Sequence, residues 1–187
     1  MSDEEIIELF HSERGEDQAF RMLIKEYGER LYWHIRKIVI NHEDSNDILQ
    51  NVFVKIWKGI EEFRYEAKLF TWMYKVATNE AINFLNEKRR KPYGNSEEIT
   101  VMLENRLESD PYFDGDDIQR ELQKAVLRLS ERQRMIFNMK YYDDMKYEDM
   151  AEILNVAVGT LKATYHMAVK KIEESLKISD TLQEFEY

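Results

Sequence analysis

Apolar side chains recur every three or four residues over the first half of the chain. The first series is Phe20, Ile24, Tyr27, Leu31, Ile35 and Ile38. This spacing predicts one long helix that starts near Asp17. Asn41 then stands where it can cap a second helix, whose apolar positions are Leu49, Val52, Phe53, Ile56 and Ile60. A third helix is expected from about Phe70 to Arg90, with Met73, Ala77, Ala81, Phe84 and Leu85 on its inner side.

Three helices with one apolar stripe each can bury those stripes against one another. We therefore expect a helical bundle in residues 1–91, with the short segment DEEIIELF packed onto it. Residues 92–117 show no such periodicity and contain both prolines of the chain. They predict a flexible or extended acidic linker.

The periodic pattern returns after the linker, in residues 118–187. Ile118–Leu129 is amphipathic, and SERQ at Ser130–Gln133 is a capping box that begins a helix ending near Tyr141. Two further helices are expected at Tyr147–Leu154 and Val158–Leu176. No segment has the alternation of a strand, so the predicted fold is all-α, with two small helical domains joined by the linker.

The last two predicted helices have the spacing of a helix-turn-helix. Ala151 is small enough for two helices to cross closely, and Asn155 tolerates the left-handed backbone of a tight turn. Leu161 supplies a core contact from the second helix. Its opposite side presents Gly159, Lys162, Ala163, His166 and Lys170.

Charge makes this second helix unusual. The chain has a formal net charge of −10, yet the stretch VGTLKATYHMAVKKI holds three lysines, one histidine and no acid. A helix that enters the major groove of DNA needs such a face, because phosphates line both walls of the groove. The alternative is a solvated face of a helical bundle that happens to lack acids.

The third helix of the first domain offers another polar face. Asparagine is a poor helix former, so a row of asparagines on a helix suggests a function such as reading base edges. The row comprises Thr71, Lys75, Thr78, Asn79, Asn83, Asn86 and Arg90. The stretch FRYEAK just before it could receive an unstacked base. The alternative is an ordinary polar face whose cationic end complements the helix dipole.

The second helix exposes Asp44, Asp47, Gln50, Asn51 and Lys55, which predicts a solvated or partner-binding face. A metal-dependent hydrolase that used these carboxylates would need further ligands, and His11, His34, His42 and His166 are scattered. The chain has no cysteine, and we expect no metal and no cofactor. The acidic start MSDEEIIELF and the lack of a membrane-length apolar run indicate a cytoplasmic protein without membrane insertion.

Three segments in order resemble the bacterial extracytoplasmic-function (ECF) sigma factors of the sigma-70 type. They are EDSNDILQNVFVKIW, FRYEAKLFTWMYKVATNEAINFL and LSERQRMIFNMKYYDDMKYEDMAEILNVAVGTLKATYHMAVKKI. The resemblance covers nearly the whole chain. It implies a non-catalytic subunit that binds core RNA polymerase and promoter DNA and directs transcription initiation. An anti-sigma factor is a further partner of many relatives.

The resemblance also implies roles for individual residues. Asp47, Gln50 and Phe53 match a segment that binds the clamp helices of polymerase, and the implied polymerase-binding set is Asp44, Asp47, Gln50 and Asn51. The minus-ten promoter element would be bound by Phe63, Arg64, Tyr65, Lys68, Lys75, Thr78, Asn79, Asn83, Asn86 and Arg90. The minus-thirty-five element would be bound by Thr160, Lys162, Ala163, His166 and Lys170. The linker would thread toward the RNA path of polymerase, and Trp72, in TWMYK, is either part of a family motif or plain core.

Several positions depart from the family pattern. Thr78 stands where arginine is common and Asn83 where aspartate is common. In the segment matched to the reader of the minus-thirty-five element, four further residues differ from those often found in the family, namely Ala157, Thr164, Met167 and Val169. Fewer arginines should lower non-specific affinity for phosphates. Besides the hydrolase, the alternative function is a stand-alone helix-turn-helix regulator that never enters polymerase.

Overall fold

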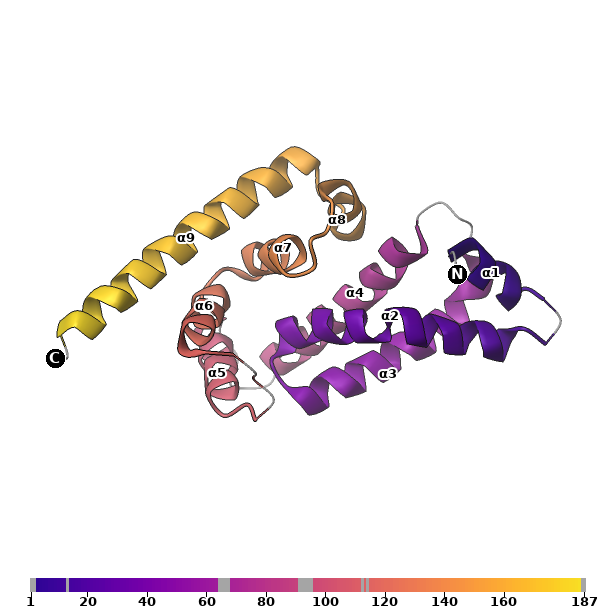
Figure 1. The fold of residues 1–187 in the computed structure, drawn as a ribbon, viewed down its shortest axis with the longest axis horizontal. Helices are drawn as coiled ribbons and strands as arrows, with labels where there is room; N and C mark the ends of the chain where they lie inside the picture. The colour runs from indigo at the N-terminus through magenta and orange to yellow at the C-terminus, as the bar shows by residue number, and fades with distance from the viewer. Residues whose placement is uncertain are drawn as a thin grey trace. The chain divides into compact units, whose positions relative to one another are not determined.

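The computed structural model describes residues 3–12, 14–63, 68–90, 96–111, 113 and 115–185, and within these ranges the regular structure is entirely helical. The chain divides into two compact units, Met1–Lys88 and Arg89–Tyr187. Figure 1 shows the helices in chain order. The expectation of an all-α fold is confirmed.

The amino-terminal unit contains α1 (Asp3–Phe10), α2 (Glu16–Val39), α3 (His42–Gly59), the short 3-10 helix η1 (Ile60–Glu62) and α4 (Leu69–Arg90). α2 and α3 pack side by side along much of their lengths (Figure 1). The predicted apolar stripes are largely buried, including Leu31 in α2, Val52 in α3 and Leu85 in α4. α1 packs on α2, as expected, and buries Ile6, Ile7 and Phe10.

A two-residue turn joins α2 to α3. Ile40 ends α2 in the left-handed region, with φ 54° and ψ 26°, and its N–H donates to the carbonyl of Arg36. A β-branched residue rarely adopts this conformation, and here the Ile40 side chain is buried, which offsets the strain. The Asn41 side chain then accepts a hydrogen bond from the Asp44 N–H at 2.8 Å. The predicted cap therefore fixes where α3 begins.

The carboxy-terminal unit contains α5 (Ser96–Glu108), α6 (Asp117–Leu127), α7 (Glu131–Tyr141), α8 (Tyr147–Leu154) and α9 (Val158–Phe185). α6 begins with a reciprocal capping box between Asp116 and Gln119 that the sequence analysis did not predict. At α7 the Ser130 side chain accepts from the Gln133 N–H at 3.4 Å, which is one half of the predicted capping box.

α5 corrects the expectation for residues 92–117. A helix of thirteen residues occupies the middle of the range that was predicted to be a flexible or extended linker. Its buried side chains Ile99, Leu103 and Leu107 lie four residues apart and form one narrow stripe. Acidic residues surround this stripe, and the two prolines flank the helix. These features led to the prediction of a linker, although the three apolar residues have helical spacing.

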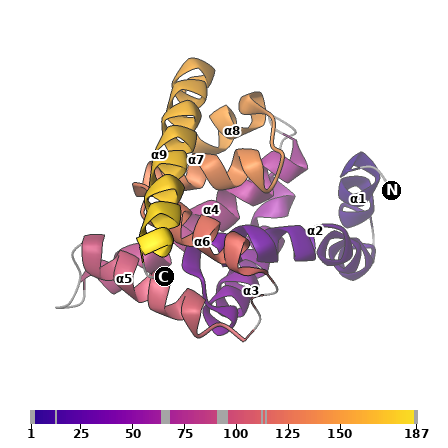
Figure 2. The same cartoon turned by 60° about the vertical axis from the view of Figure 1, so that its left-hand side comes forward.

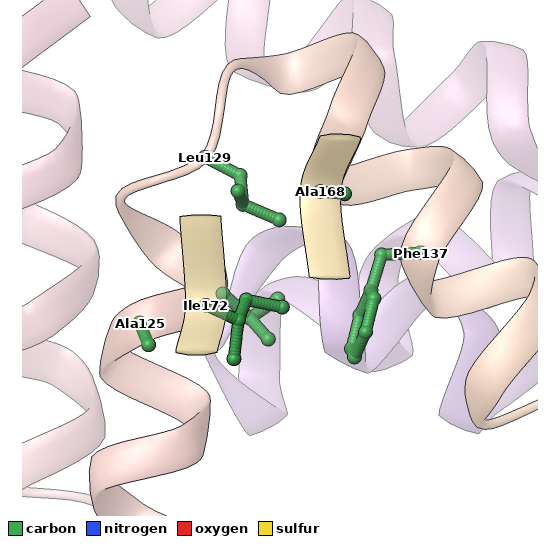
Figure 3. Close-up of a cluster of buried hydrophobic side chains, with 6 residues drawn as sticks. Ala125, Leu129, Phe137, Ala168 and Ile172 are labelled. Atoms are coloured by element: carbon green, nitrogen blue, oxygen red, sulfur yellow. The ribbon is translucent and has the colours of Figure 1, made fainter. Parts of the chain in front are cut away.

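α6, α7 and α9 share one core cluster. It contains Ala125, Val126, Leu129, Phe137, Ala168 and Ile172. In Figure 3 the labelled members of this set point toward one another from three helices and from the turn after α6. The cluster holds one side of α9 against the unit and thereby decides which side of α9 is exposed.

Within the described part of the chain, every helix is too short or too polar to cross a membrane.

Candidate functional surfaces

The turn between α8 and α9 has the predicted helix-turn-helix geometry. Asn155 takes the left-handed conformation, with φ 52° and ψ 51°, and its N–H donates to the carbonyl of Ala151. The N–H of Val156 donates to the same carbonyl at 3.1 Å. Leu161 is fully buried one turn into α9. Figure 2 shows the short α8 beside one end of the long α9.

The first four turns of α9 expose the side that the sequence singled out. Every residue predicted to contact the minus-thirty-five element is exposed, namely Thr160, Lys162, Ala163, His166 and Lys170. A Cβ added to Gly159 would meet nothing within 4 Å, so the backbone is open there to close approach. No acid occurs between Val158 and Ile172. We call the five exposed side chains of Thr160, Lys162, Ala163, His166 and Lys170 the α9 face.

A tyrosine ring connects the α9 face to the preceding helices. The Lys162 ammonium lies 5.6 Å from the centre of the Tyr147 ring, and the Lys140 ammonium lies 5.7 Å from it. One ring thus attracts two cations, through the electrostatic attraction between a cation and an aromatic face. Burial, followed by the proximity of Tyr147, raises the pKa of the nearby Tyr165 phenol.

Sequence reasoning missed Lys140 and Tyr147. Tyr147 is the first residue of α8 and Lys140 belongs to α7, so periodicity within α9 could not indicate either of them. The available signal was the position of Tyr147 at the start of the helix-turn-helix, where a helix begins beside its partner.

α4 exposes a shorter polar row than the sequence analysis expected. Lys75, Asn79 and Asn83, spaced four residues apart, are exposed, and Asn86 is half-buried. We call these four side chains the α4 face. The side chain of Arg90 lies outside the described part of the chain.

Thr78 does not belong to this face. It is 2 % exposed, its hydroxyl donates to the Tyr74 carbonyl at 2.7 Å, and its Oγ1 lies 2.9 Å from Nε2 of His34 in α2. The prediction that Thr78 is available to bind DNA is therefore wrong. Thr71 is likewise buried. Both threonines lie on the flank of α4 that turns into the bundle, where Thr78 is hydrogen-bonded and the Thr71 hydroxyl has no hydrogen-bond partner among the described residues.

The loop before α4 is only partly described. Phe63 is half-buried, and its ring centre lies 5.4 Å from that of Trp72. Trp72 in turn packs so close to Gly59 that a Cβ there would lie 3.1 Å from Cζ2 of the indole. Trp72 is therefore a packing residue that supports Phe63. Lys68 is exposed, whereas Arg64 and Tyr65 lie outside the described residues.

α3 presents the predicted partner face. Asp47, Gln50 and Asn51 are exposed, and Val54 continues the same row with 52 % of its surface exposed. We call these four side chains the α3 face. The sequence analysis did not include Val54 in this face, although its spacing from Gln50 and Asn51 places it on their side.

Asp44 differs from the other predicted polymerase contacts. It is half-buried and forms an ion pair with Lys88 of α4, with 3.2 Å between Oδ2 and Nζ. Further along α3, Lys55 pairs with Glu80 of α4 at 2.5 Å. These two pairs join α3 to α4. In the described residues, no group of three or more His, Asp or Glu side chains is placed to hold a metal ion.

Two family profiles match the two units separately. The profile "Sigma-70 region 2" matches residues 23–91, and "Sigma-70, region 4" matches residues 119–172. Their order and spacing are those of the resemblance described above. The fold and the matched regions define the chain as a sigma-70-type protein.

Similar proteins narrow this class. The ECF RNA polymerase sigma factor SigW of Bacillus subtilis is 24 % identical over 172 residues, which cover 88 % of this chain and 92 % of SigW. The ECF RNA polymerase sigma-E factor of Escherichia coli K12 is 25 % identical over 187 residues, which cover 95 % of each protein. This chain belongs to the ECF sigma factors, which are RNA polymerase sigma factors.

Solved structures support the same fold. RpoE from Bartonella quintana, in complex with the anti-sigma factor NepR, matches with a TM-score of 0.66 and 20 % identity, over 85 % of this chain and 97 % of RpoE. CnrH in complex with the cytosolic domain of CnrY matches with a TM-score of 0.66 and 15 % identity, over 92 % and 95 % of the two chains.

Proposed function

We propose that this chain binds core RNA polymerase through the α3 face and promoter DNA through the α4 and α9 faces. Residues 1–91 act as sigma region two, residues 118–187 act as region four, and the acidic segment between them passes through the enzyme. The observation that carries the proposal is the exposed, acid-free α9 face in a chain whose net charge is −10. The negative net charge of the chain predicts weak binding to DNA in the absence of polymerase. Polymerase must therefore bring the two DNA-binding faces to the promoter.

The α9 face has the chemistry of a major-groove reader. Lys162 and Lys170 can neutralise phosphates, His166 can donate a hydrogen bond, and the methyl groups of Thr160 and Ala163 can contact thymine. The Lys162 and Lys140 ammonium groups lie 5.6 and 5.7 Å from the centre of the Tyr147 ring. Lys140 also pairs with Asp144, so we assign the contact to the DNA backbone to Lys162. The face has no arginine to read guanine in bidentate fashion, which favours thymine methyls and phosphates as its targets.

The α4 face has a different chemistry, because amides outnumber cations. Asn79 and Asn83 can each donate and accept hydrogen bonds at base edges, and Lys75 can hold a phosphate. The buried hydrogen bond between Thr78 and His34 of α2 helps to hold α4, and therefore this face, in position. Phe63, Arg64, Tyr65 and Lys68 remain the predicted contacts to an unstacked base.

The partners follow from this assignment. The chain takes no catalytic part in RNA synthesis and acts in the cytoplasm, where polymerase works. One structural relative, RpoE, was solved with the anti-sigma factor NepR, so a protein of that class is a candidate regulator of this chain.

Run-off transcription with core enzyme tests the proposal. Lys162→Glu and Asn79→Ala should each lower initiation about ten-fold or more at a cognate promoter, since each removes a contact to DNA. Lys25→Glu is the matched control, because Lys25 is exposed on α2 and belongs to none of the three faces. If both single variants initiate as well as the control, the assignment of the faces is wrong.

A second measurement separates the chain from a stand-alone regulator. The unmodified chain should be retained by immobilised core polymerase, and Asp47→Lys should weaken this retention, because it alters the α3 face. Strong retardation of promoter DNA without polymerase, together with no binding to core enzyme, would favour the regulator instead.

A further inference from the structure

A row of cations runs along one side of α6. Arg120 and Lys124 of α6 and its C-cap residue Arg128 follow one another at intervals of four residues, and the helical backbone of Arg128 keeps all three on one side. Such a row would ordinarily attract a polyanion. In this structure, however, two acids of α5 already occupy it.

The ion pairs between α5 and α6 are specific in geometry. Nε of Arg128 lies 2.8 Å from Oε1 of Glu104, and Nζ of Lys124 lies 2.5 Å from Oε1 of Glu108. Arg120 approaches the other oxygen of Glu108 at 3.9 Å. The hydrogen bond and the charge of Lys124 lower the pKa of the Glu108 carboxyl, and the same contact raises the pKa of Lys124.

Several contacts of the described residues flank the connection between the two helices. The Ser109 hydroxyl donates to the Asn105 carbonyl at 2.9 Å, and the Asp116–Gln119 capping box fixes the start of α6. The Arg120 guanidinium also lies 5.1 Å from the centre of the Phe113 ring. α5 and α6 therefore form a helical hairpin whose polar side is a row of ion pairs.

This hairpin is built to be reversible. The paired side chains remain partly open to water, with Glu108 at 48 % and Arg128 at 58 % side-chain exposure. Exposed ion pairs contribute little stability each and weaken as salt rises. The buried apolar residues in the described part of α5 are Ile99, Leu103 and Leu107, whereas Val101 is 54 % exposed.

We propose that α5 is a releasable acidic strap, held on the cationic row of α6 in the unbound chain and detached when the chain engages polymerase. The proposal rests on the proposed function, in which the acidic segment passes through the enzyme. One set of acids cannot pair with α6 and at the same time line a path in polymerase. Binding therefore has to overcome the strap, to which both the ion pairs and the buried stripe Ile99, Leu103 and Leu107 contribute.

Hydrogen exchange on the full-length unbound chain tests the strap itself. The double variant Glu104→Gln with Glu108→Gln should speed amide exchange in residues 98–108 about five-fold, as expected for the loss of exposed ion pairs. Exchange in α3 is the internal control and should not change. The charge swap Glu104→Arg with Arg128→Glu should restore protection that Arg128→Glu alone removes. Unchanged exchange in the double variant, or no restoration by the swap, would overturn the strap.

The same measurement with core polymerase tests release. Residues 98–108 should lose the protection that depends on α6, so that the wild-type chain and the glutamine variant exchange alike in the complex. The glutamine variant should also associate with core enzyme about two- to five-fold faster than the wild type, because less has to be broken first. If the two chains keep different exchange rates in the complex, the strap is not released.

Failure of the proposed function has a different signature. A chain that does not bind core polymerase overturns both that function and the release step, whereas the exchange results on the unbound chain still decide whether the strap exists.

Discussion

The α4 face and the α9 face look alike as sequence patterns and differ as surfaces. All five residues assigned to the α9 face are exposed, whereas Thr71 and Thr78 of the α4 row are buried. The reason is the number of buried flanks. The buried residues of α9 in its described part are Leu161, Ala168 and Ile172, one stripe, while α4 also buries Tyr74 beside its main stripe. When several sides of a helix are buried, a polar residue on it can have a structural role. When only one side is buried, the polar residues on the other sides contact solvent or a binding partner.

The largest difference between a buried residue and an exposed residue of one helix should appear in α9. Leu161→Ala leaves a cavity at a fully buried site and should lower the free energy of unfolding by about 2–5 kcal/mol. Met167→Ala, at a side chain that is 55 % exposed on the same helix, should change it by less than about 0.5 kcal/mol. Urea denaturation of both variants checks this contrast. Equal effects would mean that α9 is not held by one stripe.

Two neighbouring residues of α4 sharpen the comparison further. Thr78→Val keeps the shape of the side chain but removes the hydroxyl, which leaves His34 without this buried partner and should cost about 1–3 kcal/mol of stability. Asn79→Ala, one position along, should leave stability within about 0.5 kcal/mol and reduce promoter-dependent initiation instead. Denaturation and run-off transcription on the same two proteins separate a structural polar residue from a functional one. Reversed results would return Thr78 to the DNA-binding set.

Local patterns predicted the helices whose stripes are long. The start of α3 at Asn41 and the turn at Asn155 were also predictable, because cap and turn chemistry depends on single residue types. α5 was not predictable in the same way, since its three-residue stripe stands among acids and near both prolines. Its stability depends on α6, which no property of residues 96–108 alone reveals.

The candidate surfaces were predictable to the extent that each lies on one helix. The α9 face and most of the α3 face follow from helical spacing. Thr78 was misassigned because its burial is decided by His34, which lies forty-four residues away in the sequence. The Lys140–Tyr147–Lys162 contact likewise joins three helices and appears only when they are packed.

A smaller effect is expected at the turn of the helix-turn-helix. Asn155→Ala forces an ordinary side chain into the left-handed region and should cost about 1 kcal/mol. Asn155→Gly should have little effect or stabilise slightly, because glycine adopts this conformation without strain. Thermal unfolding of the two variants checks the order. A destabilised glycine variant together with a normal alanine variant would show that the Asn155 side chain, and not its backbone, matters.

The smallest effect concerns tyrosines and appears only in alkali. Burial raises the pKa of Tyr142 in the carboxy-terminal unit to about 12, and its hydroxyl donates to Oε1 of Gln123. Burial, followed by the hydrogen bond and the charge of Asp3, also raises the pKa of Tyr27 in the amino-terminal unit. An unfolded tyrosine loses its proton near pH 10, so between pH 10 and 12 the folded state holds a proton that the unfolded state has released. Each buried phenol therefore contributes stability that is present below pH 10 and is lost as the pH rises toward 12. Tyr142→Phe should make stability fall less steeply over this interval, as measured by urea denaturation at pH 9 and pH 11.

Asp3→Asn should act on Tyr27 instead, because it removes the neighbouring charge that helps to keep the phenol protonated. If Tyr142→Phe leaves the alkaline slope unchanged while Asp3→Asn alters it, the alkali-sensitive burial belongs to the amino-terminal unit alone.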